Sequence, residues 1–218
     1  MPLSEVYNMD CMEGMAKYPN KYFELAIVDP PYGIGEDGSN NKSRGLLAKA
    51  KNYKAFSGND KNSPDKIFFD ELIRISTNQI IWGANHFICK IPYDSSCWVV
   101  LDKDNGETDF ADCELAWTSF KSAVRKYKFK WQGMLQENMK NKEIRIHPTQ
   151  KPVALYKWLL SNYSKQGDKI LDTHLGSGSC RIAAYDLGFD FTGFELDKDY
   201  YDAQEKRFNE FKAQLKLF

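Results

Sequence analysis

The chain has 218 residues, and its 30 Lys and Arg balance its 30 Asp and Glu, so the formal net charge is zero. Its mean hydropathy is -0.58, and no apolar run approaches the roughly 18 residues of a membrane helix, which argues against a membrane protein. The five cysteines are scattered and form no CxxC pair, which argues against a disulfide framework and a zinc site. The sequence shows no signal-peptide pattern. We therefore expect a cytoplasmic, metal-free protein of one domain.

Short apolar runs alternate with helical patterns, an order that predicts βαβ units, a mostly parallel sheet and an α/β fold. Strands are expected at residues 22–28, 79–83, 97–101, 113–118, 169–172 and 191–195. Helices are expected at residues 63–77, 152–163, 180–187 and 199–215. The periodicity of the first helix predicts a buried face made of Ile67, Phe68, Leu72 and Ile75.

The charges are unevenly distributed along the chain. Residues 41–66 hold seven Lys and Arg against two acids, and residues 119–151 hold nine against two, whereas 102–118 hold six acids and one Lys. Solvated faces are the ordinary explanation of such runs. The basic runs, however, overlap two segments without periodicity, 33–62 and 130–148, and long irregular segments are often functional. Together these features indicate an anionic partner.

The tetrapeptide Asp29-Pro30-Pro31-Tyr32 follows the first apolar strand. In an open α/β sheet, the carboxyl ends of the strands form the ligand crevice. The two prolines remove N–H donors, so the site offers a carboxylate, carbonyl oxygens and an aromatic ring. This combination suits an –NH2 group on a base flipped out of a duplex, with Tyr32 stacked on the base. A proline-rich turn without function is the plain alternative.

A glycine loop follows the strand that ends at Asp172. Gly176, Ser177 and Gly178 precede a helix, an arrangement that lets a ligand approach the backbone and the helix N-terminus. Glu195 ends the next strand, where a carboxylate suits ribose hydroxyls. These features indicate an adenosine-bearing cofactor. The third glycine of the dinucleotide fingerprint is replaced by Arg181, which favours S-adenosylmethionine over a dinucleotide and leaves a structural turn as an alternative.

Three motifs together resemble the amino-DNA methyltransferases, and their order resembles the permuted β group. They are the tetrapeptide 29–32, the run His147-Pro148-Thr149-Gln150-Lys151-Pro152, and the loop 172–178. The resemblance covers nearly the whole chain. It implies a Rossmann-like S-adenosylmethionine-dependent methyltransferase fold, with a mostly parallel seven-stranded sheet and an antiparallel hairpin at one edge.

The resemblance also implies roles for individual residues. Asp29, Pro30, Pro31 and Tyr32 are expected to be catalytic. The family usually has Asp-Pro-Phe at the start of the cofactor loop, so His174 is expected to replace the Phe here. The implied cofactor-binding residues are Asp10, Cys11, His147, Thr149, Lys151, Asp172, His174, Gly176, Ser177, Gly178 and Glu195.

The expected function is transfer of a methyl group to the N6 amine of an adenine flipped out of a specific site in double-stranded DNA, as in restriction–modification systems. Methylation of cytosine N4 stays open, because the family shares the acidic tetrapeptide between the two chemistries. A nicotinamide-dependent oxidoreductase built on the glycine loop and a non-catalytic DNA-binding module are more remote alternatives.

The chain is expected to lack a separate DNA-recognition domain, which is a departure from the family pattern. Residues 1–218 are therefore expected to form one methyltransferase domain, in which the basic loop segments 33–62 and 119–146 contact DNA, and a homodimer is plausible. The candidate DNA-binding residues are Lys42, Arg44, Lys49, Lys51, Lys54, Arg125, Lys126, Lys128 and Lys130.

Overall fold

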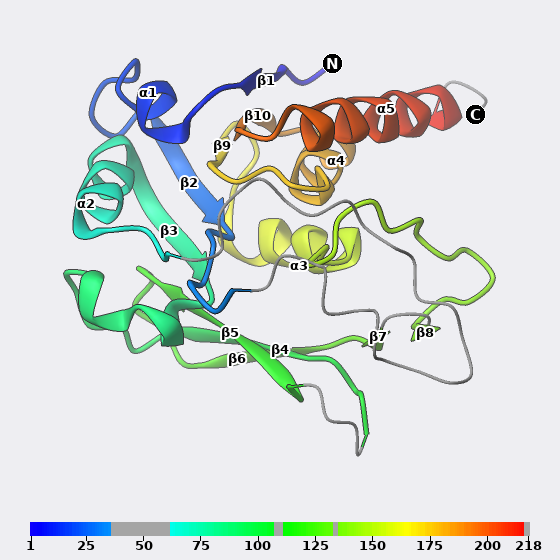
Figure 1. The fold of residues 1–218 in the computed structure, drawn as a ribbon, viewed down its shortest axis with the longest axis horizontal. Helices are drawn as coiled ribbons and strands as arrows, with labels where there is room; N and C mark the ends of the chain where they lie inside the picture. The colour runs from blue at the N-terminus through cyan, green and yellow to red at the C-terminus, as the bar shows by residue number, and fades with distance from the viewer. Residues whose placement is uncertain (36–61, 107–110, 133–134, 216–218) are drawn as a thin grey trace.

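The structure is a computed structural model that describes residues 1–35, 62–106, 111–132 and 135–215 (Figure 1). Its strands are β1 (Ser4–Asn8), β2 (Phe23–Val28), β3 (Ser76–Trp82), β4 (Trp98–Asp102), β5 (Cys113–Thr118), β6 (Arg125–Lys128), β7 (Trp131–Gln132), β8 (Leu135–Gln136), β9 (Lys169–Asp172) and β10 (Asp190–Glu195). Its α-helices are α1 (Cys11–Met15), α2 (Lys66–Ile75), α3 (Val153–Tyr163), α4 (Ser179–Asp186) and α5 (Lys198–Leu215), and two 3-10 turns span Ala84–His86 and Ile88–Lys90.

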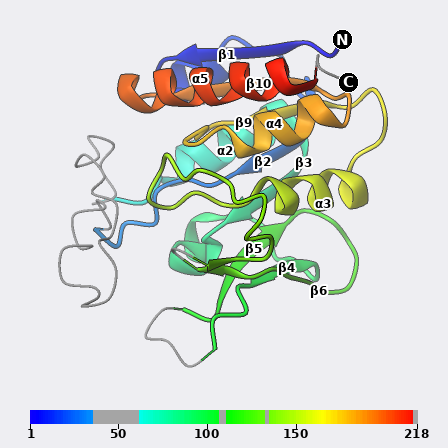
Figure 2. The ribbon, with the colours of Figure 1, turned by 90° about the vertical axis from the view of Figure 1, so that its right-hand side faces the viewer.

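The main sheet has the strand order β1-β10-β9-β2-β3-β5-β4-β6 in the described part of the chain, which runs from top to bottom in Figure 2. The five strands from β1 to β3 are parallel. Strand β5 runs antiparallel to both β3 and β4, and β6 pairs with β4 in parallel. Because β5 alone runs in the opposite direction in this sheet, its first residues lie beside the C-terminal ends of the other strands.

Helices cover both faces of the sheet, α1 and α2 on one side and α3 and α4 on the other (Figure 1). Strand β2 shows why, because its apolar residues alternate between the two layers. Leu25 and Ile27 pack in the core that includes α3 and α4, whereas Ala26 and Val28 pack in the core that includes α1 and α2. A strand buried on both faces reads as a continuous apolar run, as β2 does.

The sheet has its topological switch point between β9 and β2. From β9 the chain continues to β10 on one side, and from β2 it continues to β3 on the other side. Ala26 pairs with Leu171 across this junction, so the two strands end close together. Ligands of open α/β sheets bind where the strand order reverses. Asp29 follows β2 and Asp172 ends β9, so the tetrapeptide and the glycine loop meet at this point.

The two ends of the segment 36–61 are held together beside the tetrapeptide. Gly33 has a φ of +77°, and a Cβ atom there would stand 2.8 Å from the backbone N of Ser63. The ammonium of Lys90 donates to the hydroxyl of Ser63 at 2.7 Å and to the carbonyl of Pro64 at 2.9 Å. The chain therefore leaves and re-enters the described core at one place.

The predicted α/β fold is confirmed, as are all six strands and four helices, with β5 matched to the residue. The sheet has eight strands where seven were expected, because Arg125–Lys128 in the basic segment forms strand β6 outside the hairpin. Segment 119–146 is therefore not a continuous loop. Ile67 was wrongly assigned to the buried face of α2, since it is 65% exposed and Phe69 is buried instead.

Among the described helices, none is long and apolar enough to cross a membrane.

Candidate active site

Asp29 and Tyr32 form the polar end of strand β2. The Tyr32 hydroxyl donates to Oδ1 of Asp29 at 2.8 Å, and Pro30 between them is buried. The prolines hold the backbone extended and leave its carbonyl oxygens as acceptors. Burial raises the pKa of Asp29, whereas Lys151 and hydrogen bonds oppose that rise.

The ring of Tyr32 contacts two residues that follow strand β3. It lies against the backbone of Gly83, where a Cβ atom would stand 2.1 Å from Cε1 of the ring. His86 stacks on it, with ring centroids 5.1 Å apart and an angle of 17° between the planes. The tyrosine is thereby fixed as a flat aromatic surface next to the Asp29 carboxylate.

Lys151 joins the site from the turn before α3. Its ammonium lies 2.5 Å from Oδ2 of Asp29, 3.1 Å from Oε2 of Glu114 and 3.2 Å from the Tyr32 hydroxyl oxygen. The side chain is only 3% exposed. Although burial lowers the pKa of Lys151, the carboxylates of Asp29 and Glu114 raise it above its ordinary value. Lys151 is thus a charged, internal counter-ion of the tetrapeptide, and its contacts are there rather than on the glycine loop.

The glycine loop is built from backbone in the left-handed region. Gly176 has a φ of +49° and Gly178 a φ of +71°, and a Cβ atom at 178 would press against Gln204 at 3.1 Å. The N–H of Gly176 donates to Oε2 of Glu195 at 2.8 Å. Ser177 is buried, and its hydroxyl lies 3.0 Å from that of Ser179 at the start of α4.

Arg207 of helix α5 fastens this loop from behind. Its guanidinium donates to the carbonyl of Ser177 at 2.8 Å and to the hydroxyl of Ser179 at 2.9 Å. It also donates to Oε2 of Glu143 at 2.7 Å, and the other oxygen of Glu143 accepts the N–H of Val153 at 3.0 Å. Arg207 therefore links the glycine loop to the first turn of α3.

Asp172 is the buried acid at the floor of the loop. Its Oδ1 accepts the N–H of His174 at 3.0 Å. Burial, with Asp29 and Glu195 nearby, raises the pKa of Asp172 to about 8. Burial lowers the pKa of His174 to about 4, so this imidazole is neutral near pH 7. His174 packs edge-to-face on Phe68, with ring centroids 5.4 Å apart. A phenylalanine, which the family usually has at this position, would make the same kind of packing contact.

The ends of β1 and β10 form the outer rim of the loop. Asp10 caps helix α1 by accepting the N–H of Met12 at 2.7 Å, and Cys11 begins that helix. Burial raises the pKa of the Cys11 thiol to about 12, which keeps it protonated. Leu196 is 62% exposed directly after Glu195. An exposed leucine beside this carboxylate offers an apolar surface that the motifs did not single out.

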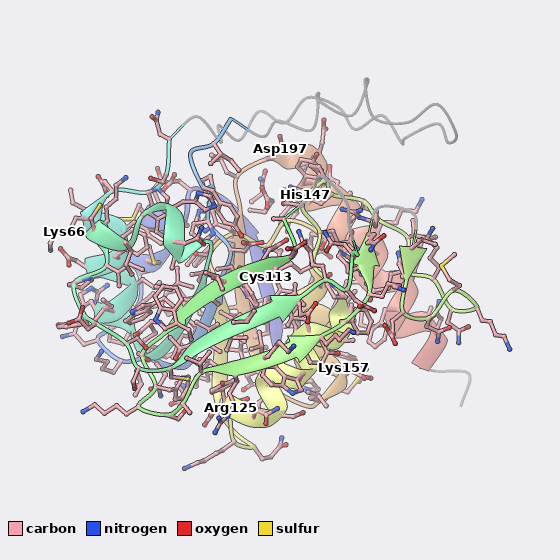
Figure 3. The ribbon with its side chains drawn as sticks, turned by 90° about the horizontal axis from the view of Figure 1, so that it is seen from below. Lys66, Cys113, Arg125, His147, Lys157 and Asp197 are labelled. Carbon is pink, nitrogen blue, oxygen red and sulfur yellow. The ribbon has the colours of Figure 1, made fainter. Side chains whose placement is uncertain are left out.

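The turn 147–152 lies over the glycine loop. A Cβ atom on Gly176 would be 3.9 Å from the His147 ring, which packs edge-to-face on Tyr200 at 4.4 Å. His147 also lies beside Asp197, as Figure 3 shows. Burial lowers the pKa of His147 to about 4, and its Nδ1 lies 3.1 Å from the Thr149 hydroxyl oxygen. His147 therefore reaches the loop, with Thr149 beside it, whereas Lys151 reaches the tetrapeptide.

The candidate DNA-binding residues are not brought together with these groups. Lys126 lies 3.2 Å from Asp102, and Lys128 and Lys130 lie 2.8 and 3.8 Å from Asp104. The acidic segment thus neutralises part of the basic one. Arg125 lies far from His147 across the sheet (Figure 3). The remaining candidates lie outside the described residues: Lys42, Arg44, Lys49, Lys51 and Lys54.

Three residues of the site were missed by the sequence motifs, namely Gly83, Glu114 and Arg207. Gly83 was read only as part of a strand, although a glycine that follows an apolar run is a possible sign of close packing. Glu114 was counted as one of many acids in the segment 102–118. Arg207 lies in a helix with many charges, and nothing local distinguishes it. Their roles depend on contacts with residues distant in sequence.

Comparisons with known proteins agree with this geometry. A family model described as a DNA methylase (N6_N4_Mtase) matches residues 61–206. The Type II methyltransferase M.HinfI of Haemophilus influenzae is 28% identical, over 96% of this chain and 69% of the relative.

Two solved structures have a similar fold. The M1.HpyAVI–SAM complex has a TM-score of 0.58 and 21% identity, covering 93% of this chain and 98% of that one. The PvuII DNA methyltransferase, described as cytosine-N4-specific, has a TM-score of 0.59 and 12% identity, covering 96% and 92%. Because the family model matches most of the chain, this protein belongs to the N6/N4 family of DNA methylases.

Proposed function

We propose that this protein transfers the methyl group of S-adenosylmethionine to the exocyclic N6 of an adenine in DNA. The observation that carries the proposal is the junction of β2 and β9, where the Asp29–Tyr32 pair stands beside the glycine loop. An acceptor for an amine and a cradle for a cofactor therefore share one edge of the sheet. DNA methylation itself follows from membership of the family.

The residues around the loop fit S-adenosylmethionine better than a dinucleotide. Asp172 and Glu195 present carboxyl groups at the loop, and Asp10 stands near His174. Acidic groups repel a pyrophosphate and attract the ammonium of an amino acid. Asp172 would hold that ammonium, Glu195 the ribose hydroxyls, and His147 and Thr149 would cover the methionine part. This fit disfavours the nicotinamide alternative.

The bound cofactor supplies a methyl group on a cationic sulfonium, which is already activated for transfer. The residues of the chain then need only present the amine. The Asp29 carboxylate and the Pro30 carbonyl accept its two hydrogens and turn the nitrogen lone pair toward the methyl group. The new C–N bond replaces the methyl–sulfur bond of the cofactor, which leaves as a neutral thioether, and the nitrogen gives up a proton to Asp29. Tyr32, held by Gly83 and His86, stacks on the flipped base.

Adenine is proposed over cytosine because the tetrapeptide begins with Asp29. In the family that this chain resembles, Ser-Pro-Pro-Tyr is more typical of cytosine N4 enzymes. The similarity to the PvuII enzyme concerns the fold alone at 12% identity, and it therefore does not favour cytosine. Methylation of cytosine N4 is the outcome that would replace the proposal.

We further propose that residues 1–218 act as one methyltransferase domain, with segments 33–62 and 119–146 as the parts that contact DNA. In the described portion, a DNA phosphate would take the place of Asp102 or Asp104 on the lysines of β6. A homodimer stays a prediction, which light scattering of the purified chain would test.

The test is transfer of a tritiated methyl group to unmethylated genomic DNA, followed by digestion to nucleosides and chromatography. Label in N6-methyl-2′-deoxyadenosine supports the proposal. Label in N4-methyl-2′-deoxycytidine would replace the target base while keeping the enzyme class. DNA that stays unlabelled, although the protein shows saturable S-adenosylmethionine binding by calorimetry, would instead favour the non-catalytic DNA-binding module.

A further inference from the structure

The buried ammonium of Lys151 is shared by carboxylates from two different strands. It lies 2.5 Å from Asp29, which follows β2, and 3.1 Å from Glu114, which is the second residue of β5. Lys151 is 3% exposed, whereas the side chains of Asp29 and Glu114 are 17% and 29% exposed. The charge of Lys151 must therefore be balanced inside the protein, since solvent hardly reaches it.

Glu114 is positioned to be a second carboxylate partner of the Lys151 ammonium. Its Oε1 lies 3.4 Å from Nζ of Lys103, and its Oε2 faces Lys151. Burial raises the pKa of Glu114, but the ammonium groups of Lys151 and Lys103 lower it by more. The pKa of Glu114 is therefore below its ordinary value, and Glu114 remains a carboxylate. The side chains thus alternate in charge from Lys103 through Glu114 and Lys151 to Asp29.

The contact between Lys151 and Asp29 conflicts with the acceptor role of Asp29. The ammonium occupies Oδ2 at 2.5 Å, and the Tyr32 hydroxyl occupies Oδ1 at 2.8 Å. A carboxylate oxygen can accept more than one hydrogen, but an incoming neutral amine is a weaker donor than an ammonium. The amine therefore binds Asp29 well only if the hold of Lys151 on that carboxylate is loosened.

We propose that Glu114 is a positioning residue for methyl transfer, which takes over the Lys151 ammonium when the target amine reaches Asp29. This inference rests on the proposed function of the site. The movement required is short, because Lys151 already contacts both carboxylates. In this role Glu114 does not itself bind the base and acts only through Lys151, which it contacts at 3.1 Å.

The inference makes a prediction for the pH profile of the reaction. The groups that influence Asp29 are Lys151, Glu114 and Tyr32, and Asp172 and Tyr156 lie near the same pair. Among these, Glu114 is a like charge that raises the pKa of Asp29. Removal of its charge would let Asp29 ionise at lower pH, so the acid limb of the rate profile should move to lower pH.

The experiment compares Glu114→Gln, Glu114→Asp and the unmodified chain. The readouts are the single-turnover rate of methyl transfer against pH at saturating S-adenosylmethionine, the cofactor Kd by calorimetry, and the melting temperature. The matched control is Glu71→Gln, which removes a similarly exposed carboxylate paired with Arg74 on α2, away from the site.

We expect Glu114→Gln to lower the plateau rate about tenfold, the size of one lost hydrogen bond to a charged group, and to shift the acid limb downward. The cofactor Kd should stay within about twofold, since Glu114 does not contact the loop. Glu114→Asp should recover part of the rate, and Glu71→Gln should match the unmodified chain. An unchanged rate in a folded Glu114→Gln, or a lowered rate without a shift of the acid limb, would overturn the inference.

Failure of the proposed function has a different signature. If the unmodified chain labels neither adenine nor cytosine, the proposed function and this inference fall together. If the unmodified chain is active and Glu114→Gln is equally active, only the inference falls. Should Glu114→Gln melt early, Glu114→Asp carries the test, because it keeps the charge and changes only its reach.

Discussion

The ring of Tyr32 lies directly on the backbone of Gly83, so closely that a Cβ atom at position 83 would stand 2.1 Å from Cε1 of the ring. Gly83 also has a φ of +68°, a conformation that other residues adopt only with strain. Strand β3 is thus followed by the one residue type that lets the tyrosine lie flat beside Asp29.

The first prediction concerns Gly83→Ala. The new methyl group should push the Tyr32 ring away from His86 and from Asp29, which should lower methyl transfer at least about tenfold while the cofactor Kd stays nearly unchanged. Gly167→Ala is the matched control, because Gly167 has a φ of +93° with open space around it. Both variants should lose about 1 kcal/mol of stability from backbone strain. Equal rates in the two variants would show that the Tyr32 contact is unimportant.

The second prediction concerns Asp29→Asn, which keeps the shape of the side chain and removes its charge. Methyl transfer should fall at least about a hundredfold, since the charged group that binds the amine and takes its proton is lost. Cofactor binding should persist, as it should in Asp29→Ala. Lys151 keeps Glu114 as a partner at 3.1 Å, so the variant should fold. Asp70→Asn, at an exposed pair with Lys66, serves as the control. Full turnover in Asp29→Asn would refute the role of the carboxylate.

The third prediction is that cofactor affinity rises with pH up to about 8 and then levels off. Burial raises the pKa of Asp172 to about 8, so the free protein holds a proton there at neutral pH. A bound ammonium favours the carboxylate, and binding should release that proton. Calorimetry in buffers of different ionisation enthalpy measures the release, which Asp172→Asn should abolish. A pH-independent Kd between pH 6 and 8 would contradict this reading.

The same raised pKa has an effect of fixed sign on the stability of the free protein. The folded state binds the Asp172 proton more tightly than the unfolded state does. The contribution of Asp172 to the free energy of unfolding is therefore complete below pH 4, near the ordinary pKa of an aspartate, and is lost as the pH rises toward 8. Bound cofactor should offset part of this loss, which thermal melts across that range would detect.

The fourth prediction concerns Arg207→Met, which removes the link between the glycine loop and α3. The variant should lose about 2 kcal/mol of stability, because Glu143 is left as a largely buried carboxylate without its partner. The loop should also hold the cofactor less tightly, by about tenfold in Kd. Lys157→Met breaks a more exposed pair with Asp186 and should change neither quantity appreciably. Denaturant unfolding and calorimetry measure both effects.

The fifth prediction tests the basic face on β6. Asp104→Asn should release Lys128 and Lys130 from their carboxylate and increase DNA affinity. Lys128→Gln should weaken binding and lower the slope of log K against log salt by about 0.9, the value for one phosphate contact. Fluorescence anisotropy with labelled duplex at several salt concentrations measures both. If neither variant alters binding, DNA does not contact this face.

Local patterns sufficed for most of the fold and for part of the site. Strand β5 was predicted to the residue, and the motifs located Asp29, Asp172 and Glu195 at strand ends. Strand β6 escaped prediction because three of its four residues are charged, a composition that protects an edge strand and resembles a loop. Glu114 escaped because β5 is antiparallel, and strand direction depends on pairing with distant strands. The contact of Lys151 with Asp29 spans 122 residues.

The contact between Gly33 and Ser63 fixes the chain on either side of residues 36–61 next to the tetrapeptide. These two anchor points do not depend on how many residues lie between them, and closing a segment between fixed ends costs only about 0.6 kcal/mol for each doubling of its length. A change in the length of that segment should therefore leave Asp29 and Tyr32 in their places.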